Sequence, residues 1–452
     1  MKKNDIIEIT IDALTGGGDG VGHAEDGRVV FVPNAAVNDR LRVKIIRLKP
    51  RYALSKIEEI VTPAAERVKS DCAVSDRCGG CVFRHISYEA ECEIKYNGVK
   101  DSMNRIGGIP ITPKAMIAAE MINGYRNKAQ LPVGTKKNGN IICGFYAKSS
   151  HRIVPFESCP LQPPLFSAVT KAFCDWANKY RLTAFDETTG KGLLRHLYLR
   201  MGFESGELMV AVVAAKNELP KSRELIESLK AVAGDALHSV ILNVNSKKTN
   251  VVLGKTCRTL FGSDTISDTL CGVKVSLSPL SFYQVNRGMA EKLYKKAKEL
   301  AKPDGKVVLD LYCGAGTIGL SMAKEAKKII GVEIVPQAVE NAKENAKSNG
   351  IDNAEFICMD AADAAKMLKE QGRSPDVVLL DPPRKGCDSG LLSTIAEGFR
   401  PERIVYISCN DATLARDCKI LEELGYQTVE VTPVDLFPRT GHVECVVLLT
   451  KG

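Results

Sequence analysis

Short apolar runs alternate with stretches of helical spacing in the C-terminal part of the chain. Each run is predicted as a strand and each following stretch as a helix. The first strand starts at Val307, and the next are Lys328–Ile334, Glu355–Met359, Asp376–Leu380 and Arg403–Ile407. Two final runs, Gln427–Thr432 and His442–Leu449, have no helix between them, so we expect an antiparallel pair at one sheet edge. Residues 271–452 are therefore predicted as an open α/β domain.

Helix boundaries in this region are marked by the usual residues. One apolar stripe runs through Met289, Leu293, Ala297 and Leu300 and stops at Pro303-Asp-Gly305. A second helix is predicted over Pro336–Asn349, because proline favours a helix start and glycine, here Gly350, follows a helix end.

The N-terminal residues 1–62 show a different pattern. Short β-like runs are separated by glycine-rich turns such as Gly16–Gly20, which predicts a small β-barrel. Arg40, Arg42 and Lys44 recur at every second position and so share one strand face. This basic strip suits phosphate contacts, and the alternative is an ordinary solvated strand face.

Residues 63–270 mix helical and strand-like runs and are predicted as a central α+β domain. Alternation in Arg195–Arg200 places His196, Tyr198 and Arg200 on one face of a strand. A basic and aromatic face could bind RNA phosphates and unstacked bases. The alternative is a half-buried structural strand.

Composition sets broad limits on the class of protein. The 452 residues allow about three domains, and Lys+Arg 62 against Asp+Glu 54 leaves a net charge of +8, which permits a polyanionic partner. We find no signal-peptide pattern and no membrane-spanning run, so we expect a cytoplasmic protein. Fifteen cysteines then favour metal or catalytic thiols over disulfides.

Three cysteines lie close together in the sequence. Cys72, Cys78 and Cys81 have C-x5-C-x2-C spacing with glycines between the last two. Three thiolates can surround one soft metal centre, but a fourth ligand is needed. His85 would complete a zinc site, and Cys159, which precedes a proline, would complete an all-cysteine site. Spacing alone leaves zinc and iron–sulfur open.

The turn after the first strand of the α/β domain is a candidate nucleotide site. Gly314 and Gly316 would let the backbone approach a ligand closely. The next strand ends with an acid, Glu333, whose carboxylate could accept both ribose hydroxyls of an adenosine.

A thiol and a carboxylate are predicted near this site. Cys409 leaves a strand just before a predicted helix, whose N-terminal amides should lower the thiol pKa. Glu444 stands at the start of the last strand. A thiolate adding to carbon 6 of a pyrimidine activates carbon 5 for methylation, and a base must then remove the carbon 5 proton. Cys409 and Glu444 are the candidates for these roles.

These motifs, with Phe282–Asn286, Asp310–Gly314, Asp381–Arg384 and His442–Glu444, resemble the RNA 5-methyluridine methyltransferase family. The resemblance is to the branch with an N-terminal TRAM barrel and a [4Fe-4S] cluster, which acts on 23S ribosomal RNA. It implies a Rossmann-like methyltransferase domain and a central RNA-binding domain that carries the cluster. The expected partner is RNA, without DNA or membrane, and the protein is expected to be a monomer.

The resemblance also assigns site residues. S-adenosylmethionine is expected on Gln284, Tyr312, Glu333, Asp360 and Asp381. Cys409 is expected as nucleophile and Glu444 as base. The [4Fe-4S] cluster is expected on Cys72, Cys78, Cys81 and Cys159.

Three other functions are compatible with parts of this pattern. A cytosine-5 RNA methyltransferase uses the same thiolate chemistry, but the Ser408-Cys-Asn410 context with Glu444 fits uracil better. A transfer-RNA uracil-5 methyltransferase is closer still, although those relatives generally lack the barrel and the cluster. The third is a non-enzymatic RNA-binding protein that keeps the cofactor fold.

Overall fold

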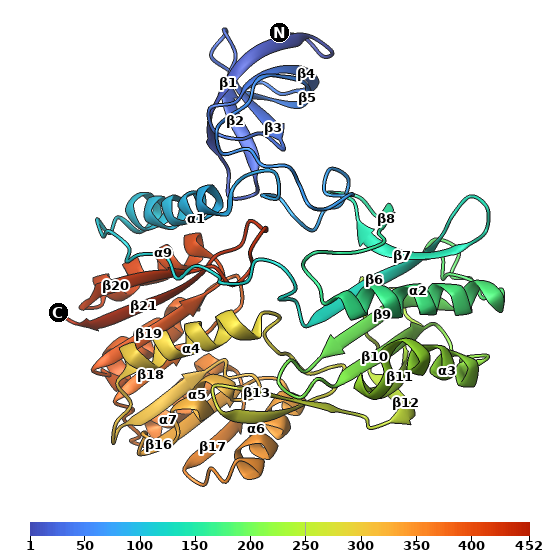
Figure 1. Ribbon diagram of the computed structural model, residues 1–452. Helices are drawn as coiled ribbons and strands as arrows, with labels where there is room; N and C mark the ends of the chain where they lie inside the picture. The colour runs from blue at the N-terminus through green and yellow to red at the C-terminus, as the bar shows by residue number, and fades with distance from the viewer. Residues whose placement is uncertain (249) are drawn as a thin grey trace.

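The computed structural model describes residues 1–248 and 250–452. A small barrel stands at one end of the molecule, above two larger sheets with their helices (Figure 1). Among the residues that the structure describes, no helix combines the length and the apolar character needed to cross a membrane.

The N-terminal barrel is closed and has the strand order β1-β2-β3-β5-β4. Its strands are β1 (Ile6–Leu14), β2 (Asp19–His23), β3 (Val29–Pro33), β4 (Arg40–Leu48) and β5 (Tyr52–Thr62). Alternate side chains such as Ile11, Val43 and Ile45 point into the interior and are fully buried. The predicted barrel is therefore confirmed.

The basic side chains of β4 do face outward, as their spacing predicts. Acids on both neighbouring strands accompany them: Arg40 pairs with Glu8 on β1, and the guanidinium of Arg42 lies 2.8 Å from the carboxylate of Glu59 on β5. The predicted basic strip is thus interleaved with acids, which favours the alternative of an ordinary solvated strand face.

A seven-stranded sheet with the order β12-β11-β10-β9-β6-β7-β8 forms the middle of the molecule. Its elements are β6 (Lys128–Thr135), β7 (Ile141–Tyr146), β8 (Ile153–Pro155), α2 (Pro164–Lys179), β9 (Leu194–Met201), β10 (Leu208–Ala214), α3 (Ser222–Ala233), the 3-10 turn Gly234–Ala236, β11 (Leu237–Val244) and β12 (Thr256–Gly262). Helices α2 and α3 cover one face through a cluster that includes Phe166, Phe173 and Leu225. The other face packs toward the C-terminal domain.

Because both faces of this sheet are covered, β9 is an inner strand. Tyr198 is fully buried, Arg200 is 1 % exposed and His196 is 8 % exposed. The hypothesis that this strand presents a basic and aromatic face to RNA is therefore wrong. The strand is also more deeply buried than the half-buried alternative.

The C-terminal sheet has the order β17-β16-β15-β18-β19-β21-β20, and the first five of these strands are parallel. Its strands are β15 (Val307–Leu311), β16 (Lys328–Glu333), β17 (Ala354–Cys358), β18 (Val377–Leu380), β19 (Arg403–Ser408), β20 (Tyr426–Val434) and β21 (Glu444–Lys451). A separate hairpin of β13 (Ile266–Leu270) and β14 (Val273–Leu277) precedes them. The expected antiparallel pair is present, with β21 between β19 and β20.

Helices cover both faces of this sheet, which makes the domain three layers thick (Figure 1). One layer contains α4 (Arg287–Ala301), α5 (Thr317–Met322) and α6 (Pro336–Ser348). The other contains α7 (Ala361–Glu370), α8 (Ser389–Ser393), the π-helical turn Thr394–Phe399 and α9 (Asp411–Glu423). The long helix α1 (Tyr88–Ser102) and its π-helical extension Met103–Gly107 pack onto α9 and complete this second layer.

Candidate active site

The glycine-rich turn connects β15 to α5 and is tightly constrained. Tyr312, Gly314 and Gly316 all have positive φ, at 64°, 55° and 78°. A Cβ on Gly316 would lie 2.9 Å from the ring of Phe356, whereas a Cβ on Gly314 would meet nothing within 4 Å. Close packing inside the protein therefore explains Gly316, and backbone conformation explains Gly314.

Glu333 ends β16 and holds this turn in place. The amide of Gly314 donates to one carboxylate oxygen at 3.1 Å, and the amide of Val335 donates to the other at 2.8 Å. Each carboxylate oxygen has two lone pairs, so Glu333 retains the capacity to accept the ribose hydroxyls expected there.

Two aspartates stand at the carboxyl ends of neighbouring strands. Asp310 belongs to β15 and Asp381 follows β18, and burial raises the pKa of each to about 7. The amide of Gly319 donates to Asp310 Oδ2 at 2.9 Å, while Asp310 Oδ1 is buried without a partner. Asp381 and Glu333 both act electrostatically on Asp310, so this edge of the sheet favours a cationic ligand.

The remaining expected cofactor residues surround the same edge. Gln284 lies near the buried hydroxyl of Tyr294 and opposes the rise that burial causes in its pKa, and this hydroxyl lies 3.2 Å from the hydroxyl of Thr317 at the start of α5. Asp360 is exposed and caps α7 by accepting from the amide of Ala362 at 2.9 Å. Burial raises the pKa of the half-buried Tyr312, and Asp360 contributes in the same direction.

Cys409 and Glu444 are brought together by strand register. In the antiparallel pair of β19 and β21, Ser408 lies opposite Cys445. Cys409 and Glu444 are the next residues along this ladder, and cross-strand neighbours have Cβ atoms about 5 Å apart. The sequence does not reveal this pairing, because it depends on which strands are adjacent.

Burial and neighbouring charges shift the pKa values of Cys409 and Glu444. Burial, followed by the neighbouring Glu444, raises the pKa of the Cys409 thiol, and Arg384 opposes this shift. The prediction that the helix N-terminus lowers this pKa is therefore wrong, because desolvation outweighs the helix amides. Burial also raises the pKa of Glu444, with Asp381 adding to the effect and Arg384 opposing it.

Arg384 is a site residue whose role the sequence did not predict. Its guanidinium lowers the pKa of the Cys409 thiol and lies 3.2 Å from the Nε2 of His442. Since Asp381 acts electrostatically on both Cys409 and Glu444, the aspartate edge and the thiol–carboxylate pair form one continuous site.

The four candidate cluster cysteines line one cavity of about 270 Å³. These are Cys72, Cys78, Cys81 and Cys159. Three basic side chains, Arg84, Arg126 and Lys128, line the same cavity. Burial raises the pKa of the Cys159 thiol to about 11, and the other three cysteines contribute to this shift.

His85 does not reach this cavity, and its Nε2 lies 2.9 Å from the backbone oxygen of Ala35 in the barrel. The zinc hypothesis that required His85 is therefore wrong. Among the described residues, no three His, Cys, Asp or Glu side chains are grouped to hold a single metal ion.

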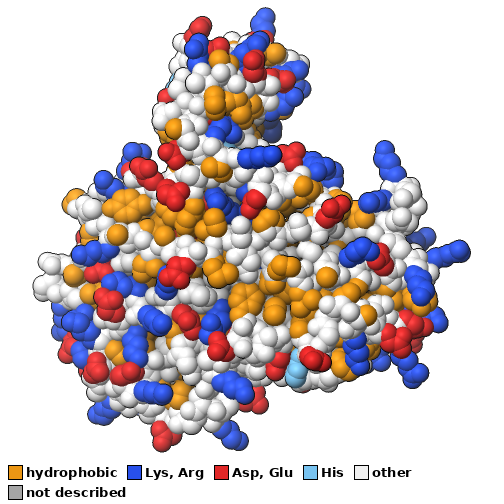
Figure 2. All heavy atoms as spheres, viewed as in Figure 1, with side chains coloured by type: hydrophobic (Ala, Val, Ile, Leu, Met, Phe, Trp, Pro, Cys, Tyr) orange, Lys and Arg blue, Asp and Glu red, His pale blue; other side chains and the backbone are white. Residues whose placement is uncertain are grey.

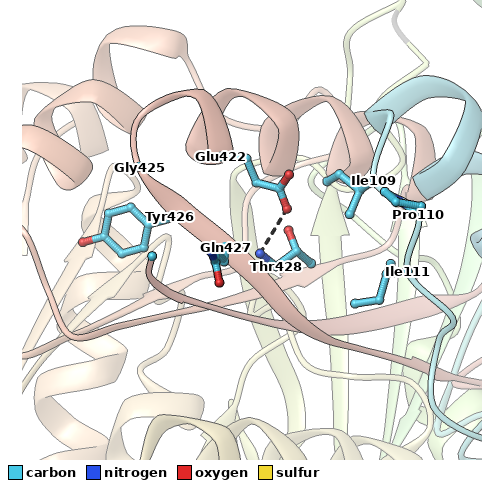
Figure 3. A pocket seen from close by; sticks show the side chains of 9 residues that line it. Ile109, Pro110, Ile111, Glu422, Gly425, Tyr426, Gln427 and Thr428 are labelled. Carbon is cyan, nitrogen blue, oxygen red and sulfur yellow. Dashed lines mark hydrogen bonds between the residues drawn. The ribbon is translucent and has the colours of Figure 1, made fainter.

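A further groove of about 550 Å³ lies between α9, β20 and the segment that follows α1 (Figure 3). Ile109, Glu422 and Thr428 are among its lining residues, and the amide of Thr428 donates to Glu422. None of the candidate site residues lines this groove.

Comparisons with known proteins agree with this architecture. The family described as tRNA (Uracil-5-)-methyltransferase matches residues 193–452, and the TRAM domain matches residues 2–57. An uncharacterized RNA methyltransferase of Clostridium tetani is 42% identical over 100% of this chain and 97% of its own length. An uncharacterized RNA methyltransferase of Halalkalibacterium halodurans is 41% identical over 99% of this chain and 98% of its own length.

A solved structure extends the likeness to three dimensions. The tRNA (uracil-54, C5)-methyltransferase of Pyrococcus abyssi, in complex with S-adenosyl-L-homocysteine, has a TM-score of 0.80 and 27% identity. The match covers 98% of this chain and 100% of that one. Fold and site together define an S-adenosylmethionine-dependent RNA methyltransferase with an N-terminal TRAM barrel. The chain belongs to the RNA uracil-5-methyltransferase family.

Proposed function

We propose that the protein methylates carbon 5 of a uridine in 23S ribosomal RNA through a covalent bond between Cys409 and carbon 6. The observation that carries this proposal is the register of β19 and β21, which makes Cys409 and Glu444 neighbours at the aspartate edge. A nucleophile and a base on one side of a cofactor site are the two groups that this chemistry requires.

Gln284, Tyr312, Glu333, Asp360 and Asp381 would hold S-adenosylmethionine, which when bound would supply a methyl group on a positively charged sulfonium. The residues present fit this ligand. The buried, unpartnered Oδ1 of Asp310 and the neighbouring carboxyls favour positive charge, and Glu333 retains acceptor capacity beside the turn.

Cys409 acts first. Its thiolate adds to carbon 6, and the electron pair displaced onto carbon 5 makes that atom the nucleophile toward the methyl group. Arg384 favours the thiolate because its guanidinium lowers the thiol pKa against the effect of burial.

Glu444 acts second. Its carboxylate takes the proton from carbon 5, the ring double bond reforms, and the bond between carbon 6 and sulfur breaks to return the Cys409 thiolate. Because burial raises the pKa of Glu444, this residue must lose its own proton before it can act, so the step is favoured at higher pH.

The cysteine cavity suits a [4Fe-4S] cluster better than a single ion. In such a cluster each thiolate binds a different iron, so the four sulfur atoms need not converge on one point. The basic residues Arg84, Arg126 and Lys128 would offset the negative charge of the cluster. Methyl transfer requires no electron, so the role of the cluster would be to stabilise the structure or to position RNA.

Ribosomal RNA is proposed because the barrel and the cysteine site together resemble the branch of the family that acts on it. The barrel alone does not distinguish the two RNAs, because the Pyrococcus abyssi structure matches 98% of this chain. The Pyrococcus abyssi relative acts on uracil 54 of transfer RNA, which makes transfer RNA the alternative. Mass mapping of nucleosides in both RNAs, with and without the protein, separates the two. Methylated cytidine would instead favour the cytosine-5 alternative.

The covalent mechanism is tested with RNA that contains 5-fluorouridine, because fluorine on carbon 5 cannot be removed by a base. We expect wild-type protein to form an adduct that survives denaturing electrophoresis, and Cys409→Ala to form none. Cys257→Ala, which changes an exposed cysteine on β12, is the matched control and should behave like wild type. Absence of an adduct with an RNA that the wild type methylates would refute the mechanism.

A further inference from the structure

The segment that delivers Glu444 runs from Asp435 to Val443, between β20 and β21, and its first half is held from outside the C-terminal sheet. The hydroxyl of Tyr125 donates to the carbonyl of Pro438 at 2.9 Å, and the side-chain amide of Asn286 donates to the carbonyl of Leu436 at 3.0 Å. The amide of Asp435 donates to the carbonyl of Ile117 at 3.0 Å. This segment therefore takes its position from distant parts of the chain.

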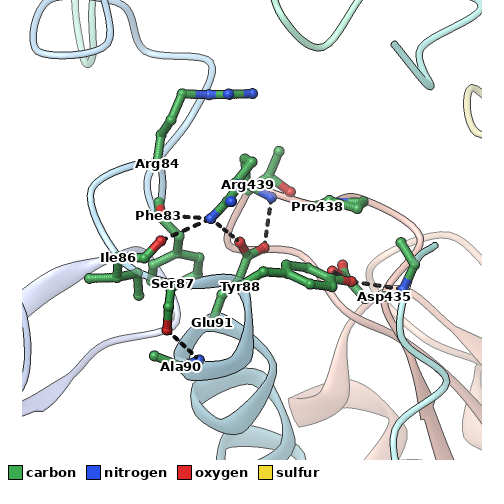
Figure 4. Close-up of polar contacts among 12 residues, drawn as sticks. Phe83, Arg84, Ile86, Ser87, Tyr88, Ala90, Glu91, Asp435, Pro438 and Arg439 are labelled. Atoms are coloured by element: carbon green, nitrogen blue, oxygen red, sulfur yellow. Dashed lines mark hydrogen bonds and ion pairs between the residues drawn. The ribbon is translucent and has the colours of Figure 1, made fainter. Parts of the chain in front are cut away.

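Arg439, in the middle of this segment, makes further contacts to distant parts of the chain through both its backbone and its side chain. It has a φ of 70°, in the left-handed region that residues other than glycine rarely adopt. Its amide donates to Glu91 Oε1 at 2.7 Å, and its guanidinium donates to the carbonyl of Ile86 at 2.9 Å (Figure 4). Its own carbonyl accepts from the amide of Val82 at 2.9 Å.

The charges around Arg439 are buried and balanced. Lys95 lies 2.7 Å from Glu91 and 2.8 Å from Asp435, and the hydroxyl of Tyr88 donates to Asp435 at 2.7 Å. The side chains of Glu91 and Asp435 are 0 % exposed. Buried ions persist only when each has its partners, so this set fixes the segment against α1 in one arrangement.

We infer that Arg439 and Glu91 are positioning residues for the base Glu444, an inference that rests on the proposed function. The contact between Arg439 and Glu91 affects the site through the short stretch of chain from Arg439 to Glu444. His442, which follows Arg439, reaches Arg384, and Arg384 in turn contacts Cys409. A shift at Arg439 therefore displaces the carboxylate relative to the thiol.

This role has a kinetic signature that a general structural role lacks. The base acts only after Cys409 has bonded to the ring and carbon 5 has received its methyl group. A misplaced Glu444 slows the last step and leaves earlier steps unchanged. A covalent, methylated adduct should then accumulate on ordinary uridine RNA.

The test uses Arg439→Gly, since glycine adopts the left-handed conformation readily, so the backbone contacts can persist while the side chain is lost. With radiolabelled methyl donor and ordinary RNA, we expect adduct formation within about twofold of wild type and adduct release slowed about tenfold or more. Arg439→Lys keeps the charge and should restore release in part. Arg400→Gly changes another arginine with positive φ, on an exposed helix end, and is the matched control.

Equal slowing of formation and release, or no change in either, would overturn the inference. Loss of the folded state in both Arg439 variants, monitored by near-ultraviolet circular dichroism, would also overturn it. Failure of the proposed function looks different, because wild-type protein would then form no adduct with 5-fluorouridine RNA.

Discussion

Among the single residues, Cys409 has the most consequential environment. Burial raises its thiol pKa, so the reactive thiolate is a small fraction at neutral pH and increases as the pH rises. We therefore expect alkylation of Cys409 by iodoacetamide in the free protein to accelerate about tenfold per pH unit from pH 6 to 8. Peptide mass spectrometry separates this cysteine from the other fourteen of the 15 in the chain.

Arg384→Ala should slow this alkylation further, because the guanidinium is the group that lowers the pKa of Cys409. Lys385→Ala changes the adjacent exposed cation and should have little effect. A rate that levels off below pH 7 in the wild type would contradict the raised pKa.

The candidate residues were predictable from sequence, but their interactions were not. Cys409 and Glu444 follow from the chemistry of pyrimidine methylation and from the motifs around them. Arg384, His442 and Arg439 acquire their roles through contacts between segments far apart in the chain, which spacing does not reveal. The predicted direction of the shift in the Cys409 pKa was wrong, because a helix N-terminus can be predicted from a sequence and desolvation cannot.

At the scale of elements, β9 connects the middle sheet to the cofactor domain. The guanidinium of Arg200, on this strand, donates to the carbonyls of Ser278 and Ser281 at 2.7 Å each. The side-chain amide of Asn127, which precedes β6, donates to the carbonyl of Gln284 at 2.8 Å. The segment that carries Gln284 is thus held by the neighbouring sheet.

Arg200→Leu should leave two carbonyls without donors. We expect a loss of about 2 kcal/mol in unfolding free energy and weaker binding of S-adenosylmethionine. Denaturant unfolding and titration calorimetry measure the two effects. Arg200→Lys keeps the charge and can serve one carbonyl, so an intermediate result is expected.

Arg223→Leu, on α3, is the surface control. If Arg200→Leu bound S-adenosylmethionine as tightly as wild type, this would contradict the claim that β9 positions the segment that carries Gln284.

Strand and helix positions were predicted well where apolar runs are continuous. The predicted strand Arg403–Ile407 is β19 (Arg403–Ser408), and the predicted helix Pro336–Asn349 is α6 (Pro336–Ser348). The prediction failed on β9, because alternating polar residues normally indicate one exposed face. Here the polar face contacts another domain, and its guanidinium is satisfied by carbonyls of that domain.

At the scale of the whole molecule, the cysteine cavity draws on several parts of the chain. Three cysteines come from the linker after the barrel, Cys159 comes from the segment after β8, and Val285 comes from the segment between β14 and α4. A metal centre there would fasten these parts together.

We expect protein purified without oxygen to contain about four iron and four sulfide per chain. Cys159→Ser should reduce both contents and lower the thermal unfolding midpoint, whereas the exposed Cys257→Ser should change neither. Elemental analysis and thermal scans provide the measurements. Stoichiometric zinc without iron would contradict the cluster.

The pairing of Arg439 with Glu91 has a consequence for how the protein is made. The two residues are 348 positions apart, so at 5–20 residues per second Glu91 is synthesised about 20–70 s before Arg439. During that interval the ion pair between Glu91 and Lys95, one helical turn apart, can form, whereas their partners Asp435 and Arg439 have not been synthesised. The glycine-rich turn at Gly314 and Gly316 is therefore synthesised before the segment that holds Glu444 against α1.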